Sequence, residues 1–206
     1  NNRIVERYET PFGAYWVSYD FDGNSGRKNI FEFPLGPSDS PNSFEHAGGE
    51  IIFNLPNGMQ AYMLVDSDGN RLNKAPVEIV SDSRQRDQSV ENGISCMSCH
   101  YEGMREPKRS NELRQHVLKN PAAFKKDERE TILALYVSKE EFADRLEEDR
   151  RTFLRAVKAA NVPLTETEPI VSLASRFEED LDLEGGWEKV EQILSLLLPT
   201  NCGGLH

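Results

Sequence analysis

Residues 50–66 have the sequence EIIFNLPNGMQAYMLVD, which is the clearest fold signal in the chain. Two segments rich in apolar and β-forming residues, 50–55 and 60–66, flank the sequence Pro56-Asn57-Gly58. An Asn-Gly pair between two such segments is typical of a β-hairpin. We therefore predict a β-hairpin over this stretch.

Further β structure is expected around this hairpin. Residues 14–21 are rich in Tyr, Trp, Val and Phe and precede an Asp22-Gly23-Asn24 turn, so they are predicted to form a strand. Residues 30–33 are predicted to form another short strand. Beyond the hairpin, Asp66-Ser67-Asp68-Gly69-Asn70 resembles a calcium loop but lacks its distant Glu, so we interpret it as a turn.

Beyond residue 85 the pattern changes to that of charged amphipathic helices. Ser138 and Glu141 form a capping-box signature at the start of the longest helix, and Pro163 lies beyond its end. Two shorter helices are predicted at residues 169–181 and 187–198. The apolar residues that recur at three- and four-residue spacings are Leu113, Val117, Ile132, Leu135, Tyr136, Phe142, Leu146, Phe153 and Val157.

These patterns predict an α+β protein with two structural halves. The β-rich region, residues 1–84, contains the hairpin and is expected to pack on a mainly α-helical region, residues 85–206.

The composition is that of an acidic globular protein. The chain has 206 residues, 37% of them hydrophobic, with 35 Asp and Glu against 24 Lys and Arg, which gives a net charge of −11. A chain of this length can bury a core without disulfides. A negative surface disfavours nucleic acid and anionic membranes and favours a basic partner, such as a small cationic redox protein.

Targeting signals are absent from the sequence as given. No apolar segment approaches the roughly 20 residues that a membrane-spanning helix needs. The chain also lacks an initiator Met and a basic-plus-apolar signal segment, so Asn1 is expected to be a processed end or an artificial boundary.

The sequence Cys96-Met97-Ser98-Cys99-His100 matches the attachment pattern for haem c. Two thiols three positions apart can lie on one face of a helical turn, where they add to the two vinyl groups of the haem. His100 then supplies the proximal iron ligand. We therefore predict one covalent haem c bound by Cys96, Cys99 and His100, and a cytochrome c-like helical half.

Other uses of a Cys-x-x-Cys pair fit less well. A structural zinc site needs a second pair of ligands, and the sequence offers none at suitable spacing. A thioredoxin-like pair should follow a strand in a βαβ unit, and a disulfide across so short a loop is strained.

The chain contains two segments of interest, residues 44–58, FEHAGGEIIFNLPNG, and residues 92–100, NGISCMSCH. Together they resemble a family of exported c-type cytochrome-domain proteins of planctomycetes and related bacteria. The resemblance extends from about Asn2 to the helix predicted at residues 169–181. It implies export to the periplasm or the cell exterior and a covalent haem, and it implies no particular substrate.

The distal iron ligand separates an electron carrier from a reactive haem. No Met follows Met104, although small cytochromes c usually take their second ligand from a downstream Met. We prefer His46, because Gly48 and Gly49 follow it and would let the backbone approach a flat cofactor. A Met ligand and an open or water-bound iron remain the alternatives. The other candidates upstream and downstream are Met59, Met63, His116 and His206.

The leading functional hypothesis is an exported monohaem c-type cytochrome that transfers electrons to or from a redox partner. The alternative is a haem enzyme or gas sensor with an open distal site, in which His46 acts as a peroxidase-like acid–base group. A third hypothesis makes the haem half the redox module of a longer polypeptide. Cys202, the remaining cysteine, is expected to be a free thiol or to link two copies by a disulfide.

Overall fold

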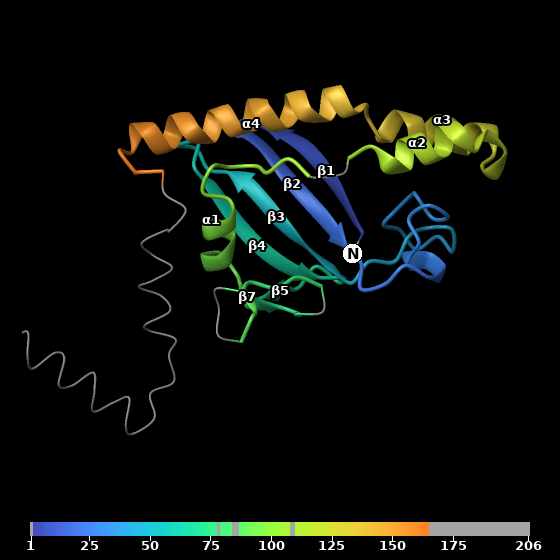
Figure 1. Cartoon of the computed structure of the whole chain (residues 1–206), viewed down its shortest axis with the longest axis horizontal. Helices are drawn as coiled ribbons and strands as arrows, with labels where there is room; N and C mark the ends of the chain where they lie inside the picture. The colour runs from blue at the N-terminus through green and yellow to red at the C-terminus, as the bar shows by residue number, and fades with distance from the viewer. Residues whose placement is uncertain (1, 78, 84–86, 108–109, 165–206) are drawn as a thin grey trace, which may run out of the picture. The chain divides into compact units, whose positions relative to one another are not determined.

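The structure is a computed structural model that describes residues 2–77, 79–83, 87–107 and 110–164. The chain divides into two units, residues 1–171 and 172–206, and all that follows concerns the first. This part is α+β, with a β-rich N-terminal half and helices in the C-terminal half (Figure 1). The helices predicted at residues 169–181 and 187–198, together with Cys202 and His206, lie outside the described residues.

A five-stranded antiparallel sheet has the strand order β1-β2-β3-β4-β5, so each strand pairs with its neighbour in sequence. The strands are β1 (Arg3–Thr10), β2 (Gly13–Asp20), β3 (Gly48–Asn54), β4 (Gln60–Asp66) and β5 (Arg71–Leu72), and a separate pair is formed by β6 (Lys74–Ala75) and β7 (Val90–Glu91). The predicted hairpin is confirmed, because β3 and β4 pair from Gly48–Asp66 to Asn54–Gln60. The strand predicted over residues 14–21 is confirmed as β2, whereas β1 was not predicted.

Side chains alternate between the two faces of this sheet, and the faces have different neighbours. The helix face contacts α1 and α4, as described below, and the opposite face contributes Ile4 and Tyr19 to a core cluster with Phe21 and Phe44. By the strand register, the helix face carries Trp16, Ser18, Glu50, Ile52 and Tyr62, and the opposite face carries Tyr19, Ile51 and Met63.

The short strand predicted over residues 30–33 is wrong. These residues form turns after the 3-10 helix η1 (Gly26–Lys28). The carbonyl of Asn29 accepts hydrogen bonds from the backbone N–H groups of Glu32 and Phe33, so local turns satisfy this part of the backbone. The side chain of Ile30 does not belong to a strand. It is buried in a core cluster with Ile4, Phe21 and Phe44, which explains why this position is apolar.

The helices are α1 (Ile94–Cys99), α2 (Glu112–Lys119), α3 (Lys126–Leu135) and α4 (Lys139–Ala159), with a 3-10 turn η2 (Pro121–Ala123). The predicted cap of the longest helix is confirmed, since the Ser138 hydroxyl accepts a hydrogen bond from the N–H of Glu141 at 3.1 Å. Leu135 departs from the predicted buried pattern, because it ends α3 and is 65% exposed. No helix in the described ranges is long and apolar enough to cross a membrane.

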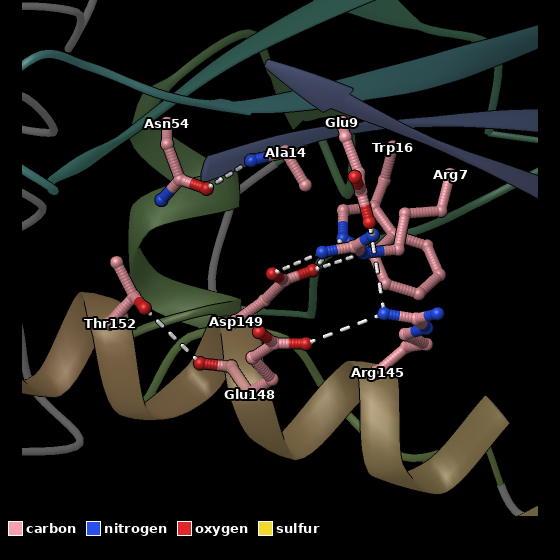
Figure 2. Close-up of polar contacts among 9 residues, drawn as sticks. All are labelled: Arg7, Glu9, Ala14, Trp16, Asn54, Arg145, Glu148, Asp149 and Thr152. Atoms are coloured by element: carbon pink, nitrogen blue, oxygen red, sulfur yellow. Dashed lines mark hydrogen bonds and ion pairs between the residues drawn. The ribbon is translucent and has the colours of Figure 1, made fainter. Parts of the chain in front are cut away.

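Helix α4 is joined to the sheet by a buried polar cluster that we call the Asp149 clamp, formed by Asp149, Arg7 and Trp16 (Figure 2). Figure 2 shows the Asp149 carboxylate pointing from α4 toward both partners. Arg7 donates two hydrogen bonds of 2.9 Å to this carboxylate, and the indole N–H of Trp16 donates a third of 2.8 Å. Trp16 also packs against Leu146, so the clamp and an apolar contact hold the same helix.

Candidate haem site

The attachment motif lies on α1 and at its C-terminal end, next to β3 and β4 (Figure 1). Two side chains at the start of the helix connect it to the chain before it. The Asn92 side-chain carbonyl accepts a hydrogen bond from the N–H of Leu64 on β4 at 2.9 Å, and the Ser95 hydroxyl accepts one from the N–H of Glu91 at 3.1 Å. These contacts fix the position of α1 against the helix face of the sheet.

The two cysteines of the motif occupy one turn of α1 but differ in exposure. Cys96 is 2% exposed, and Cys99 is partly exposed. Burial raises the pKa of the Cys96 thiol, and the nearby Glu50 carboxylate raises it further. In the described part of the chain the two cysteines form no disulfide with each other.

The imidazole of His100 is oriented by the loop that follows the motif. Its Nδ1 lies 3.2 Å from the carbonyl oxygen of Gly103. Because a carbonyl can only accept, Nδ1 carries the proton, and the lone pair belongs to Nε2. Histidines that ligate metals are usually held by this type of hydrogen bond. Burial also lowers the pKa of His100, which favours the neutral form that binds iron.

Gly103 is required by this arrangement. Its φ is +90°, a left-handed conformation that favours glycine. A Cβ at this position would lie 3.1 Å from the ring of Phe153 on α4, so a side chain would crowd the helix. The glycine therefore lets the loop pass close to α4 while its carbonyl faces His100.

A carboxylate faces Nε2 of His100, the unprotonated nitrogen of the ring. Glu50 Oε2 lies 3.8 Å from Nε2, which is longer than a hydrogen bond, and both side chains are 13% exposed. The ring of Tyr62 on β4 lies on the same side, with its centroid 5.9 Å from that of His100. Sequence analysis missed Glu50. The available signal was a charged residue at a core-facing position of the predicted hairpin, two residues before the buried Ile52.

His46 is not placed beside His100. Its ring packs edge-on against Tyr19 at 5.0 Å and Phe44 at 6.2 Å between centroids. Tyr19 belongs to the opposite face of the sheet, whereas His100 contacts the helix face. Distal ligation by His46 stays a prediction.

The two glycines after His46 have a role that differs from our interpretation. A Cβ on Gly49 would lie 1.8 Å from the carbonyl oxygen of Ser18, and one on Gly48 would lie 2.7 Å from that of Val65. These glycines therefore permit close packing of β3 against its neighbouring strands. They do not indicate the approach of a flat cofactor.

The remaining candidate ligands among the described residues also point elsewhere. Met104 packs in the apolar cluster around Trp16. Met63 pairs with Ile51 on the opposite face, and Met59 lies in the hairpin turn. His116 packs against aromatic rings of the chain, with Phe31 the nearer at 5.2 Å between centroids.

The stretch from Asp66 to Asn70, which resembles a calcium loop in sequence and was predicted to be a turn, is confirmed as a turn. The carboxylate of Asp66 accepts hydrogen bonds from the N–H groups of Asp68 and Asn70 and from the Asn70 amide.

Within the described residues, no group of three or more His, Cys, Asp and Glu side chains is arranged to hold a metal ion. The candidate site therefore consists of Cys96, Cys99 and His100, with Gly103 and Glu50 on either side of the imidazole.

Comparison with known proteins does not identify a family for this chain. No protein-family model matches it, and no match was found among the curated proteins or the solved structures.

Proposed function

We propose that the chain is an exported monohaem c-type cytochrome, with haem attached to Cys96 and Cys99 and ligated by His100. One observation carries this proposal. The hydrogen bond between His100 Nδ1 and the Gly103 carbonyl leaves Nε2 unprotonated, directly after a helical turn that holds two thiols. A haem-attachment site needs this combination of two sulfur nucleophiles and one oriented neutral imidazole.

The two thiols and the imidazole are the groups that a covalent haem needs, but the described fold is closed and leaves no space of that size between them. Cys96 is buried, and the cavity that adjoins Glu50 has a volume of about 50 Å³, far smaller than a porphyrin. Helix α1 and the sheet would therefore have to separate for Cys96, Cys99 and His100 to hold a haem. The bound haem would supply one-electron chemistry between ferric and ferrous iron, and the protein would hold and orient it through the two thioethers and His100.

Electron transfer is the function we favour. The net charge of −11 would attract a basic redox partner over long range. We further propose that the helical half is cytochrome c-like, as in the exported family that the sequence resembles, and that the protein acts in the periplasm or outside the cell. Cys202 would remain a free thiol or link two copies by a disulfide.

A haem enzyme or gas sensor is the second candidate, and the placement of the other possible ligands favours it. Among the described residues, His46, His116 and Met104 pack against other parts of the chain, whereas electron carriers commonly place a His or Met at the second axial position. An iron without a strong second ligand would be accessible to small molecules.

Spectra of the purified, haem-loaded protein distinguish these functions. A carrier should titrate reversibly as a one-electron couple, and its ferrous form should bind carbon monoxide slowly or not at all. Rapid carbon monoxide binding to the native ferrous protein would instead support the enzyme or sensor. A protein that gives neither a reversible haem couple nor a carbon monoxide complex would contradict both.

A further inference from the structure

We infer that residues 93–103 form a flap, which opens about Gly93 and Gly103 while the rest of the fold stays in place. The flap contains α1, the loop that follows it and the three residues of the attachment motif that carry its chemistry. Its opening would uncover Cys96, which is 2% exposed in the described fold. The inference concerns the packing of the chain itself, so it holds whether or not the proposed haem is attached.

A glycine in a left-handed conformation stands at each end of the flap. The φ angle is +83° at Gly93 and +90° at Gly103. Glycine adopts left-handed and ordinary conformations at similar cost, so the backbone can rotate at these two positions. A Cβ on Gly93 would meet no atom within 4 Å, so the surroundings of this residue leave space for such a rotation.

The residues just outside the two glycines are held to the rest of the fold. The Asn92 side chain accepts a hydrogen bond of 2.9 Å from the N–H of Leu64 on β4, and the Asn92 N–H donates one of 2.8 Å to the Asn73 carbonyl. At the other end, Met104 packs in the apolar cluster around Trp16. Movement is therefore confined to the stretch between these anchors.

Several hydrogen bonds of the flap begin and end inside it. Backbone bonds run from the N–H of Met97 to Gly93, from that of His100 to Cys96 and from that of Gly103 to His100, each 2.8 Å long. The His100 imidazole is held within the same segment, by the carbonyl of Gly103. Separating the flap from the sheet does not require any of these bonds to break, which lowers the cost of opening.

The contact between the flap and Glu50 on β3 is a weak one. The carboxylate lies 3.8 Å from Nε2 of His100, and its other neighbour in the flap is the Cys96 thiol, a weak donor. Arg3 attracts Glu50 electrostatically, but its Nη2 donates a hydrogen bond of 2.9 Å to Asp20. A largely buried carboxylate with these partners regains hydration when the flap opens.

The test measures how often Cys96 becomes accessible in the haem-free full chain carrying Cys202→Ser. Timed alkylation with mass spectrometry gives the rate at Cys96, at reagent concentrations where this rate is proportional to reagent and so reports the open fraction. Gly93→Ala is compared with Gly69→Ala. Gly69 is the matched control, because its φ is +81°, its Cβ would also meet no atom within 4 Å, and it lies in the turn between β4 and β5.

The two alanines introduce the same kind of backbone strain, but only Gly93 adjoins the flap. Gly93→Ala should speed alkylation of Cys96 at least about fivefold, since opening relieves the strain of an alanine in this conformation. Gly69→Ala should leave the rate within about twofold of the parent, because its strain is not relieved when the flap opens.

Urea provides a second measurement that needs no glycine variant. In the parent, 1 M urea should raise the rate at Cys96 less than about twofold, because opening of the flap exposes little new surface. If Cys96 reacted only after global unfolding, the rate should rise about fivefold or more per molar urea.

Three results would overturn the inference. Equal acceleration by Gly93→Ala and Gly69→Ala would show that Cys96 becomes accessible only through global unfolding, and a steep urea dependence in the parent would show the same. An unchanged rate in Gly93→Ala would show that the backbone does not rotate there. Failure of the proposed haem attachment is distinguishable, because the exported protein would then carry no covalent haem while these rates kept the expected pattern.

Discussion

Two acidic side chains on the helix side of one sheet, Asp149 and Glu50, are both largely buried but are paired very differently. Asp149 accepts two hydrogen bonds from Arg7 and one from Trp16, all between 2.8 and 2.9 Å (Figure 2). Glu50 lies 3.8 Å from Nε2 of His100, beyond hydrogen-bond distance, and its other neighbours include the Cys96 thiol and Arg3. The Asp149 carboxylate links a helix to the sheet through hydrogen bonds, which stabilises the fold. The Glu50 carboxylate instead lies beside the thiol and the imidazole of the candidate site.

The largest effect is expected from breaking the Asp149 clamp. Asp149→Ala leaves the largely buried Arg7 with only its 3.4 Å contact to the exposed Glu9, so it should reduce the free energy of unfolding by about 3–5 kcal/mol. Urea unfolding followed by circular dichroism measures this loss. Asp144→Ala is the control, since Asp144 is exposed on the same helix, and it should change stability by less than about 0.5 kcal/mol. Similar losses in the two variants would contradict a structural role for the clamp.

A double-mutant cycle compares the pairing in the two regions. The cycle of Arg7→Met and Asp149→Asn should give a coupling free energy of about 1–3 kcal/mol, because the two side chains share two hydrogen bonds. The cycle of Glu50→Gln and His100→Gln in haem-free protein should give about 0.5 kcal/mol or less, because His100 is neutral and no hydrogen bond joins the pair. Equal coupling would remove the distinction between the regions.

Thiol chemistry should reveal how closed the proposed haem site is in protein without haem. In haem-free Cys202→Ser protein, Cys99 should be alkylated at least about tenfold faster than Cys96, because burial raises the pKa of Cys96 and limits access to it. Mass spectrometry of timed samples gives both rates. In urea the two rates should converge. A faster reaction at Cys96 under native conditions would show that α1 does not pack as described.

A smaller effect concerns acid stability. Burial lowers the pKa of His46 and His100 in the folded protein below the unfolded value of about 6.5. The unfolded state therefore binds more protons below this pH, and stability should be complete above pH 6.5 and fall as the pH decreases. In protein that carries the proposed haem, iron would occupy His100, so His46→Phe should flatten the remaining fall in the thermal midpoint between pH 7 and pH 5. An unchanged slope would exclude His46 as its source.

Local signals explain which parts of the fold were predictable. The hairpin and α4 follow from turn residues, a cap and apolar spacing, all within a few neighbouring residues. The Asp149 clamp has no such signal, because its partners Arg7 and Trp16 are 142 and 133 residues away in sequence. The wrong strand at residues 30–33 shows the converse. Apolar residues there fill a core from a turn, so composition alone suggested the wrong element.

The candidate site was likewise predictable only where its residues are contiguous in sequence. The motif at residues 96–100 is contiguous, so sequence alone indicated the thiols and the imidazole. The groups on either side of His100 come from separate segments, with Glu50 on β3 and Gly103 after the motif. The glycines beside His46 suggested cofactor contact, yet they are explained by strand packing, because a Cβ on Gly49 would strike the carbonyl of Ser18.

The central claim is tested most directly by the intact mass of the denatured protein, produced with export and a c-type maturation system. We expect the mass of one haem above that of the polypeptide, located by peptide mapping to residues 96–100, and a c-type pyridine haemochrome spectrum. Cys202→Ser should retain this added mass, and Cys99→Ala should lose most of it. Zinc without haem, or haem released on denaturation, would contradict the claim that Cys96, Cys99 and His100 form a covalent haem site.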